Sequence, residues 1–463
     1  MPARVLRRGS AVVATALAIA MLTASAGRTA PHPTAFAHLR AIDARSPAPQ
    51  YRRFGSPGVA AVAAYAAQQL AAAGYVVRRV DVPHPRYAPD YSPGHQPELI
   101  RLGDHHAFKV DSAFYMTKVT GPGGLNCTVR LAADVQPGDC GLVTFAQASP
   151  DFRNVMYGPG SVLAQIKSRG GVAAVVEGDA ARGLVLALRT TVALPTIVAV
   201  ARDTDLVGQR VHLRVMGGLQ PATLHNIVAV HRPAKGSKYV ILTGHLDGWF
   251  QAASDNGAGA AAVLRTAQLL GHSGVGVAVG LFDGEEVGLL GSQAVAKEMA
   301  TGLDMGDCRP ALRLSDITAD VNLDAPSARA RDVAGGNAPV FSWRAMVFSE
   351  EGVVASTFIS VFMAHGVAGL PINARTATIA NGGMDRTDAH WFDAAGIPVA
   401  WPVTGYAEYH TDGDTLAVVD PADLEAISQA SAELVTDLAA LPVGHVVGTT
   451  LPAAAPSRVG CRP

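Results

Sequence analysis

The 463-residue sequence carries little charge and no excess of either sign. Only 16% of its residues are charged, and 37 Lys and Arg residues are balanced by 38 Asp and Glu residues. This balance leaves no surplus of cations to neutralise a phosphate backbone, so we do not expect nucleic acid as a partner. Hydrophobic residues make up 49% of the chain, a composition typical of globular proteins and not of disordered ones.

Long apolar runs are absent after the first 26 residues. Within those residues, Arg4, Arg7 and Arg8 precede an apolar run at 11–22, and Ala-Ser-Ala follows at 24–26. The pattern is typical of a signal peptide cleaved after residue 26, and about twelve apolar residues are fewer than the roughly twenty that span a bilayer. We therefore expect a secreted, extracellular protein, exported by the general or the twin-arginine route, with no membrane association after cleavage.

The sequence has four cysteines, and no two lie at the C-x-x-C spacing of a zinc site. Four cysteines fit disulfide formation in an oxidising compartment. Cys127 and Cys140 are close enough in sequence to close a small loop, which would leave Cys308 and Cys461 as the second pair. Four cysteines allow three pairings, so the other two stay open.

The order of expected strands and helices divides the chain into parts. From residue 226 onward strands and helices alternate, which predicts an α/β fold with a mainly parallel mixed sheet and helices on both faces. Between about 113 and 218, short strands separated by turn residues indicate a small, β-rich inserted domain. Residues 83–103 are expected to form a loop. The predicted parts are a signal peptide at 1–26, a first part of the main domain at 27–112, the insertion at 113–218, a second part of the main domain at 219–443, and a C-terminal tail at 444–463.

Two helix starts are clearly signalled. Ser56 followed by Pro57, and Asp420 followed by Pro421, each place a capping side chain before a proline in the first turn. We therefore predict helices that begin at these two positions.

Histidines and acidic residues gather where the expected strands of the second part of the main domain end. In open α/β sheets, ligands bind at the carboxyl ends of the strands, so these side chains are expected to meet. One such residue alone is usually an ordinary surface or core group. The set together supplies two imidazoles and three carboxylates, with a further Glu beside one of them, and this mixture of N and O ligands suits zinc. The residues are His245, Asp247, Asp255, Glu285, Glu286, Asp324 and His410.

With these residues in view, the sequence resembles the co-catalytic di-zinc aminopeptidase family, which includes secreted bacterial leucyl aminopeptidases and, more distantly, glutamate carboxypeptidase and the transferrin receptor. The resemblance covers about residues 53–441, and the segment 113–218 is similar to the protease-associated (PA) domain of many members. Four strings carry it, in the family's order: His-Leu-Asp at 245–247, Ser-Asp-Asn-Gly-Ala-Gly at 254–259, Gly-Glu-Glu-Val-Gly-Leu-Leu-Gly-Ser at 284–292, and Tyr-His-Thr-Asp-Gly-Asp-Thr at 409–415.

The resemblance implies two zinc ions as cofactors. His245, Asp255 and Asp324 would hold one ion, and Asp255, Glu286 and His410 the other, so that Asp255 bridges them. A bridging carboxylate keeps two cations close enough to act on one water and one carbonyl group.

The same resemblance implies catalytic and substrate-binding roles. Glu285 would be the general base that takes a proton from the water and gives it to the leaving amine. Tyr409 would donate a hydrogen bond to the developing oxyanion, and Arg386 would bind substrate.

Two further aspartates would orient the histidine ligands. Asp247 is placed to accept a hydrogen bond from the outer ring nitrogen of His245, and Asp388 matches the family position that does this for His410.

One departure from the family concerns Asp324, which is followed by Ala-Pro at 325–326 where many members have Met and Gly. Asn322 is the alternative ligand. We prefer Asp324 because a carboxylate helps to neutralise two dications and an amide does not.

These observations predict a secreted zinc-dependent aminopeptidase, favoured as a monomer, that removes hydrophobic N-terminal residues from peptide substrates with a water bridged between two zinc ions. The excess of carboxylates would attract an α-ammonium group and repel an α-carboxylate. Trp249-Phe250 and Trp391-Phe392 are candidates for the side-chain pocket, although such aromatics are more often core. The alternatives are a carboxypeptidase or dipeptidase on the same metals, a single-zinc acyltransferase of the glutaminyl cyclase kind, and a non-catalytic binding protein of the same fold.

Overall fold

A computed structural model describes residues 32–112, 118–145, 160–187, 189–329, 343–376 and 384–442. The predicted signal peptide and C-terminal tail lie outside these residues. The chain divides into Met1–Thr34 and Ala35–Pro463, and the helices and strands described here belong to the second unit. None of the described helices is both long enough and apolar enough to cross a membrane.

The first sheet is mixed and has eight strands, in the order β1-β12-β14-β13-β15-β18-β16-β17. Its centre is parallel, because β13 pairs in parallel with β14 and β15, and β15 pairs in parallel with β18. All residues of β13 and β14 are buried, as expected of strands covered on both faces. The strands are β1 (Val76–Pro83), β12 (Thr223–His231), β13 (Tyr239–His245), β14 (Val277–Phe282), β15 (Ile317–Asn322), β16 (Trp343–Phe348), β17 (Leu370–Asn373) and β18 (Val399–Gly405).

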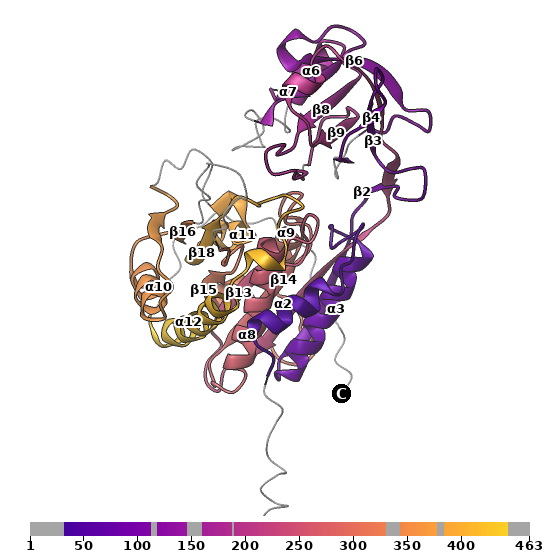
Figure 1. Ribbon diagram of the computed structural model, residues 1–463. Helices are drawn as coiled ribbons and strands as arrows, with labels where there is room; N and C mark the ends of the chain where they lie inside the picture. The colour runs from indigo at the N-terminus through magenta and orange to yellow at the C-terminus, as the bar shows by residue number, and fades with distance from the viewer. Residues whose placement is uncertain are drawn as a thin grey trace, which may run out of the picture. The chain divides into compact units, whose positions relative to one another are not determined.

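Helices cover both faces of this sheet, which confirms the predicted α/β fold. One layer contains α2 (Ala35–Asp43), α3 (Pro57–Ala72), α8 (Gly259–Leu270), α10 (Val353–Ala364) and α12 (Pro421–Ala440), which pack on one another (Figure 1). The other layer contains α9 (Leu290–Thr301) and α11 (His390–Ala394). Two separate hydrophobic clusters, one under each layer, form the core.

Both predicted helix starts are confirmed. The Ser56 hydroxyl accepts the main-chain N–H of Val59 at the start of α3. The Asp420 carboxylate accepts the N–H groups of Ala422 and Asp423 at the start of α12. Each side chain satisfies donors that the first helical turn leaves without a partner.

A second eight-stranded sheet lies between β1 and β12 in the sequence, and its order is β4-β3-β10-β6-β7-β8-β9-β5. Since β1 and β12 pair with each other along their whole length, the chain leaves the first sheet and returns to the same place. We call residues 84–222 the inserted region. Its strands are β3 (Glu98–Arg101), β4 (His106–Ala107), β5 (Val110–Ser112), β6 (Leu125–Leu131), β7 (Cys140–Val143), β8 (Ala173–Glu177), β9 (Thr196–Ala199) and β10 (Arg210–Arg214), with helices α6 (Val162–Ser168) and α7 (Asp203–Leu206) (Figure 1).

The prediction of a loop over residues 83–103 is wrong in part. Two short strands form there, β2 (Arg86–Pro89) and β3, and they pair with β11 (Gly217–Gln220) and β10. These partners lie more than a hundred residues away, so the local composition, rich in Pro, His and Tyr, gave no sign of them.

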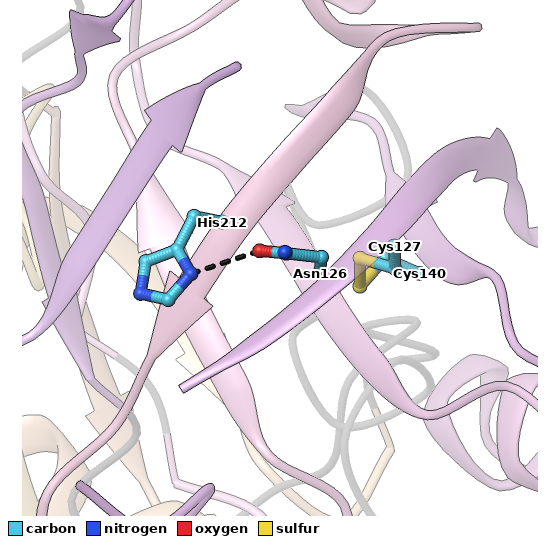
Figure 2. Close-up of a disulfide and its surroundings, with 4 residues drawn as sticks. All are labelled: Asn126, Cys127, Cys140 and His212. Atoms are coloured by element: carbon cyan, nitrogen blue, oxygen red, sulfur yellow. Dashed lines mark hydrogen bonds between the residues drawn. A yellow bond between two sulfur atoms is a disulfide. The ribbon is translucent and has the colours of Figure 1, made fainter. Parts of the chain in front are cut away.

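The predicted disulfide between Cys127 and Cys140 is confirmed, and it joins the neighbouring strands β6 and β7 (Figure 2). Beside it, Nδ1 of His212 lies 2.9 Å from Oδ1 of Asn126. Cys308 is disulfide-bonded as well, whereas its predicted partner Cys461 lies outside the described residues.

Candidate metal centre

The site lies at one edge of the first sheet, where its parallel strands end. His245 is the last residue of β13, Glu286 follows β14, and Asp324 follows β15. Because these three strands run in parallel, their carboxyl ends bring the three side chains together. Two further segments complete the group. Asp255 lies in the short helix η2 (Ala253–Ala258) before α8, and His410 lies in the loop after β18.

Asp255 lies at the centre of the group and faces both histidines. Its Oδ1 is 3.1 Å from Nε2 of His245, and its Oδ2 is 3.2 Å from Nε2 of His410. Oδ1 of Asp324 lies 3.4 Å from Nε2 of His245, and Oε2 of Glu286 lies 3.2 Å from Nε2 of His410. The five predicted ligands therefore form two triads that share one carboxylate.

The donor set and its spacing fit zinc. Ligand atoms about 2.0–2.1 Å from a tetrahedral zinc ion lie about 3.3–3.4 Å from one another, close to the 3.1–3.4 Å found between the histidine nitrogens and the carboxylate oxygens. His245, Asp255 and Glu286 are buried, and their ligand atoms lie within 4.8 Å of one another, although these three residues come from both triads. Oε1 of Glu286 is buried without a hydrogen-bond partner among the described residues, so it too can face a cation.

Without metal, the carboxylates dominate the electrostatics. Burial opposes protonation of His410, but Glu286 and Asp255 outweigh it and raise the pKa of this imidazole to about 10. Burial likewise opposes protonation of His245, and Asp324, Asp247 and Asp255 together still raise the pKa of His245 well above its ordinary value. A site that holds protons this tightly attracts cations in general.

Asp247 supports the site in two ways. Its carboxylate accepts the main-chain N–H groups of Glu285 (3.1 Å) and Glu286 (3.3 Å). Its main-chain carbonyl lies 3.0 Å from Nδ1 of His245, whereas the carboxylate lies 3.6 Å from that nitrogen. The main-chain carbonyl of Asp247 is therefore the hydrogen-bond partner of Nδ1 of His245, whereas the sequence suggested the Asp247 carboxylate.

The Asp414 carboxylate holds the backbone of the central aspartate, a role that the sequence did not predict. Its two oxygens accept the main-chain N–H groups of Ser254 (2.8 Å) and Asp255 (3.0 Å). The hydroxyl of Tyr406 donates to it at 2.8 Å. Asp414 belongs to the string at 409–415, and its place in that string is the only sequence feature that could have indicated this role.

Two more supporting residues were also missed. Oδ1 of Asn256 accepts the main-chain N–H groups of Gly259 and Ala325, and its amide donates to the carbonyl of Leu323, so it ties together the loops of Asp255 and Asp324. The indole of Trp401 donates to the main-chain carbonyl of Asp324 at 2.9 Å.

The glycine at 259 is required by a close approach of two chain segments. A Cβ there would lie 2.0 Å from both Oδ1 of Asn256 and the carbonyl oxygen of Leu323. Any side chain would push apart the two loops that Asn256 joins.

Arg52 is buried behind the site and was not predicted either. Its guanidinium donates to the main-chain carbonyls of Gln251 and Ala252, and its own carbonyl accepts the N–H of Gly248. It therefore fixes the loop that leads from Asp247 to Asp255.

Glu285 is half-buried beside the ligand Glu286. Burial raises the pKa of Glu285 well above its ordinary value, against the opposing charge of His245, and Asp324 adds to the rise. A carboxyl group with a raised pKa can exchange a proton near neutral pH.

Tyr409 stacks on the ligand His410, with ring centroids 3.9 Å apart and planes at 21°. Although Tyr409 is 43% exposed as a residue, desolvation of the phenol and the nearby charges of Asp255 and Glu286 raise the pKa of Tyr409 well above its ordinary value. The phenol therefore keeps its proton and stays a hydrogen-bond donor.

The remaining predicted residues lie in different surroundings. Asp388 is fully buried, and the charges of His245, Asp247 and Asp324 act on it. Its role as an acceptor for the His410 ring stays a prediction. Arg386 is exposed at the end of a short helical turn.

Asn322 points away from the ligand position that was its alternative assignment. It is buried in β15, where its oxygen accepts from Thr243 and its amide donates to Thr387. Asp324 instead lies beside His245. The geometry therefore favours Asp324.

Three of the four aromatic residues considered for a pocket belong to the core. Phe392 is fully buried, and Trp249 and Phe250 are 3% and 5% exposed in a hydrophobic cluster. Trp391 is half-buried and donates to the carbonyl of Leu289.

Comparisons with known proteins find one protein family and several solved structures that are similar to this chain. Residues 226–435, which include all five predicted ligands, match the model of Peptidase family M28. No curated protein matches the sequence well enough to count as a relative.

Solved structures share the fold along most of the chain. A zinc aminopeptidase from Bacillus subtilis, BSAP, superposes with a TM-score of 0.63 at 18% identity over 89% of this chain and 95% of that one. An aminopeptidase from Aneurinibacillus sp. strain AM-1 gives 0.57 at 16% identity over 92% and 97%. A peptidase M28 precursor from Shewanella amazonensis SB2B gives 0.66 at 18% identity over 94% and 98%.

Proposed function

Because residues 226–435 match the model of Peptidase family M28, we propose that the chain is a zinc-dependent exopeptidase that removes residues from the free amino end of peptides. The observation that carries the proposal is the pair of triads that share Asp255. The names of two fold neighbours, a zinc aminopeptidase and an aminopeptidase, agree with it.

Five residues would hold two zinc ions. His245, Asp255 and Asp324 would bind one, and Asp255, Glu286 and His410 the other. When bound, two such ions supply Lewis-acid polarisation of a carbonyl group and a lowered pKa for the attacking water. Three carboxylates on two dications leave the site able to stabilise further charge as the reaction proceeds.

The protein's own groups then move protons and stabilise charge. Glu285 accepts the proton of the attacking water on its carboxylate and returns it to the nitrogen of the leaving amine, a transfer that its raised pKa supports. Tyr409, which keeps its hydroxyl proton, donates a hydrogen bond to the oxyanion.

The charge of the site sets the direction of cleavage. With two zinc ions bound, the carboxylates of Asp255, Glu286 and Asp324 leave one net positive charge, and Glu285 cancels it. A substrate ammonium group can then pair with Glu285, whereas a terminal carboxylate would be repelled by it. Arg386 is the opposing charge, and a carboxypeptidase or dipeptidase would use it to bind a carboxyl terminus.

The test is hydrolysis of leucyl- and phenylalanyl-arylamides, their N-acetylated forms and carboxyl-terminal reporter peptides. Rates on the free amines should exceed those on the acetylated compounds by orders of magnitude, should vanish with a chelator and should return with zinc. Equal cleavage of acetylated compounds, or faster cleavage of the carboxyl-terminal reporters, would show that the chain is not an aminopeptidase. A lack of hydrolysis of all of them would point to a non-catalytic binding protein.

Secretion is the second part of the proposal. The N-terminal sequence with its apolar run and the disulfide between Cys127 and Cys140 support it, since disulfides form in oxidising compartments. Activity of the expressed full-length chain should accumulate outside the host cell, and deletion of residues 1–26 should keep it inside.

A further inference from the structure

We infer that the inserted region positions the metal ligand His410. The inference rests on the proposed zinc site, and it concerns residues 183–187 of the inserted region and residues 408–413 of the main domain. These two segments run side by side, so the loop that carries His410 is held from outside its own domain.

Main-chain hydrogen bonds join the two segments. The N–H of Ala187 donates to the carbonyl of His410 at 2.7 Å, and the N–H of Asp412 donates to the carbonyl of Val185 at 3.1 Å. Between these bonds, Leu186 and Thr411 form an antiparallel bridge. The result is a short two-stranded ribbon in which His410 contributes one of the paired carbonyls.

The side chain of Asp412 fastens the ribbon at its other end. Its Oδ1 accepts the main-chain N–H of Val185 at 2.9 Å, and its Oδ2 pairs with the ammonium group of Lys109. Lys109 also donates to the carbonyl of Gly183 at 3.0 Å. The Asp412 side chain thus makes two contacts with the inserted region, one to a main-chain N–H and one to a charge.

Apolar side chains of the ribbon pack against the main domain. Val185, Leu186 and Ala187 belong to the same buried cluster as Trp249 and Val287 of the main domain. The indole of Trp249 in turn lies edge-to-face with the imidazole of His410, with ring centroids 6.4 Å apart, and Val287 follows the ligand Glu286. The inserted segment therefore packs on the surroundings of two of the three ligands of the second triad, His410 and Glu286.

The backbone of His410 explains why an external support matters. His410 has a φ of 56°, in the left-handed region that side chains with a Cβ disfavour. Such a conformation persists only where the surroundings determine it more strongly than the residue's own preference. The turn within the loop supplies part of that support, since the N–H and hydroxyl of Thr411 donate to the carbonyl of Glu408. The ribbon supplies the rest.

The substitution Asp412→Ala removes both contacts of this side chain without changing any proposed ligand. We expect it to weaken the zinc ion held by Asp255, Glu286 and His410 at least tenfold, whereas the other zinc ion stays. The measurement is zinc content by mass spectrometry after dialysis against graded chelator. The variant should retain one ion at chelator concentrations where the unsubstituted protein retains two.

Three further variants separate the causes. Asp412→Asn keeps an oxygen for the Val185 N–H and should recover most of the lost zinc affinity, and Lys109→Met should have a small effect. Asp104→Ala is the matched control, because Asp104 accepts the N–H of His106 and pairs with Arg101 in the same way inside its own turn. This control should leave both zinc ions in place, and thermal unfolding of each variant checks that it folds.

The outcomes are distinguishable. If the unsubstituted protein binds no zinc, the proposed function fails. If it binds two ions and Asp412→Ala holds both with unchanged affinity, the inference about the inserted region is overturned and the proposed function stands. Should Asp412→Ala not fold, Ala187→Pro takes its place, because it removes the N–H that donates to the carbonyl of His410; a folded Ala187→Pro variant that holds both ions with unchanged affinity would overturn the inference as well.

Discussion

The carboxylate of Asp414 accepts the main-chain N–H of Asp255 at 3.0 Å, so one aspartate fixes the backbone of another that faces both histidine ligands. The second oxygen of Asp414 accepts the neighbouring N–H of Ser254. The position of the shared carboxylate is therefore set by a residue that lies 159 positions further along the chain.

Replacing Asp414 by Ala should release both zinc ions, because both triads depend on Asp255. Loss of a residue that orients a metal ligand typically lowers metal affinity or activity by about 10–100-fold. Zinc content after dialysis is the measurement. Asp420→Ala is the matched control, since Asp420 also accepts two main-chain N–H groups but caps α12, and this variant should lose about 1 kcal/mol of stability while keeping its zinc.

Glu285 and Asp255 should respond differently to substitution. Glu285→Gln removes the proposed base, so kcat should fall by about 10²–10⁴-fold while the zinc content stays near two. Asp255→Ala removes the shared ligand and should release metal. Arylamide hydrolysis and metal analysis of the same preparations check both expectations, and equal zinc loss in the two variants would show that the roles are misassigned.

Tyr409→Phe keeps a ring that can stack on His410 and removes only the hydroxyl. If the hydroxyl donates to the oxyanion, kcat should fall by about 10–1000-fold with little change in KM. Tyr409→Ala, which also removes the stacking, should in addition lower the zinc affinity. A Tyr409→Phe variant as active as the unsubstituted protein would limit the residue to a packing role.

The burial of Asp320 leads us to predict that the stability of the fold depends on pH. It is fully buried in β15, and burial raises the pKa of Asp320 to about 8, with smaller contributions from Asp388 and Asp393. One of its oxygens accepts the Thr243 hydroxyl, and the other has no hydrogen-bond partner among the described residues. The folded chain thus keeps a proton that the unfolded chain releases near pH 4, so stability falls as the pH rises from about 4 to 8, by about 1.4 kcal/mol per unit at most.

The substitution Asp320→Asn removes this titration. The difference in free energy of unfolding between Asp320→Asn and the unsubstituted protein should therefore shift in favour of the variant between pH 5 and pH 8. Urea unfolding at both pH values measures it, with the exposed Asp134→Asn as a control that should show no such shift. A difference that does not change with pH would mean that Asp320 is already ionised in the folded chain.

The disulfide between Cys127 and Cys140 should stabilise the inserted region and not the metal site. Its two cysteines are 13 positions apart, and closing a loop of this size contributes about 3 kcal/mol (Figure 2). Replacing both cysteines by Ser should lower the unfolding temperature of the inserted region and leave the zinc content unchanged. If the variant without the disulfide loses zinc at a temperature where its main domain stays folded, parts of the inserted region other than residues 183–187 must also support the metal site.

The sequence by itself determined the features that depend on neighbouring residues. Ser56 and Asp420 cap their helices within three residues, and a capping side chain needs no distant partner. The ligands at 245, 286 and 324 could be predicted because each lies at the end of a strand or within four residues after it, and parallel strands end at a common edge whatever else the chain does.

Only the tertiary structure decided which groups hold those ligands in place. Asp414 and Arg52 bind main-chain groups of the loops around Asp255, and Ala187 binds the main chain of His410. A main-chain N–H or carbonyl is the same in every residue, so a sequence does not show which one a distant side chain or segment will bind. The same reason explains β2 and β3, whose pairing partners lie far along the chain: their strands form because of hydrogen bonds that local composition does not encode.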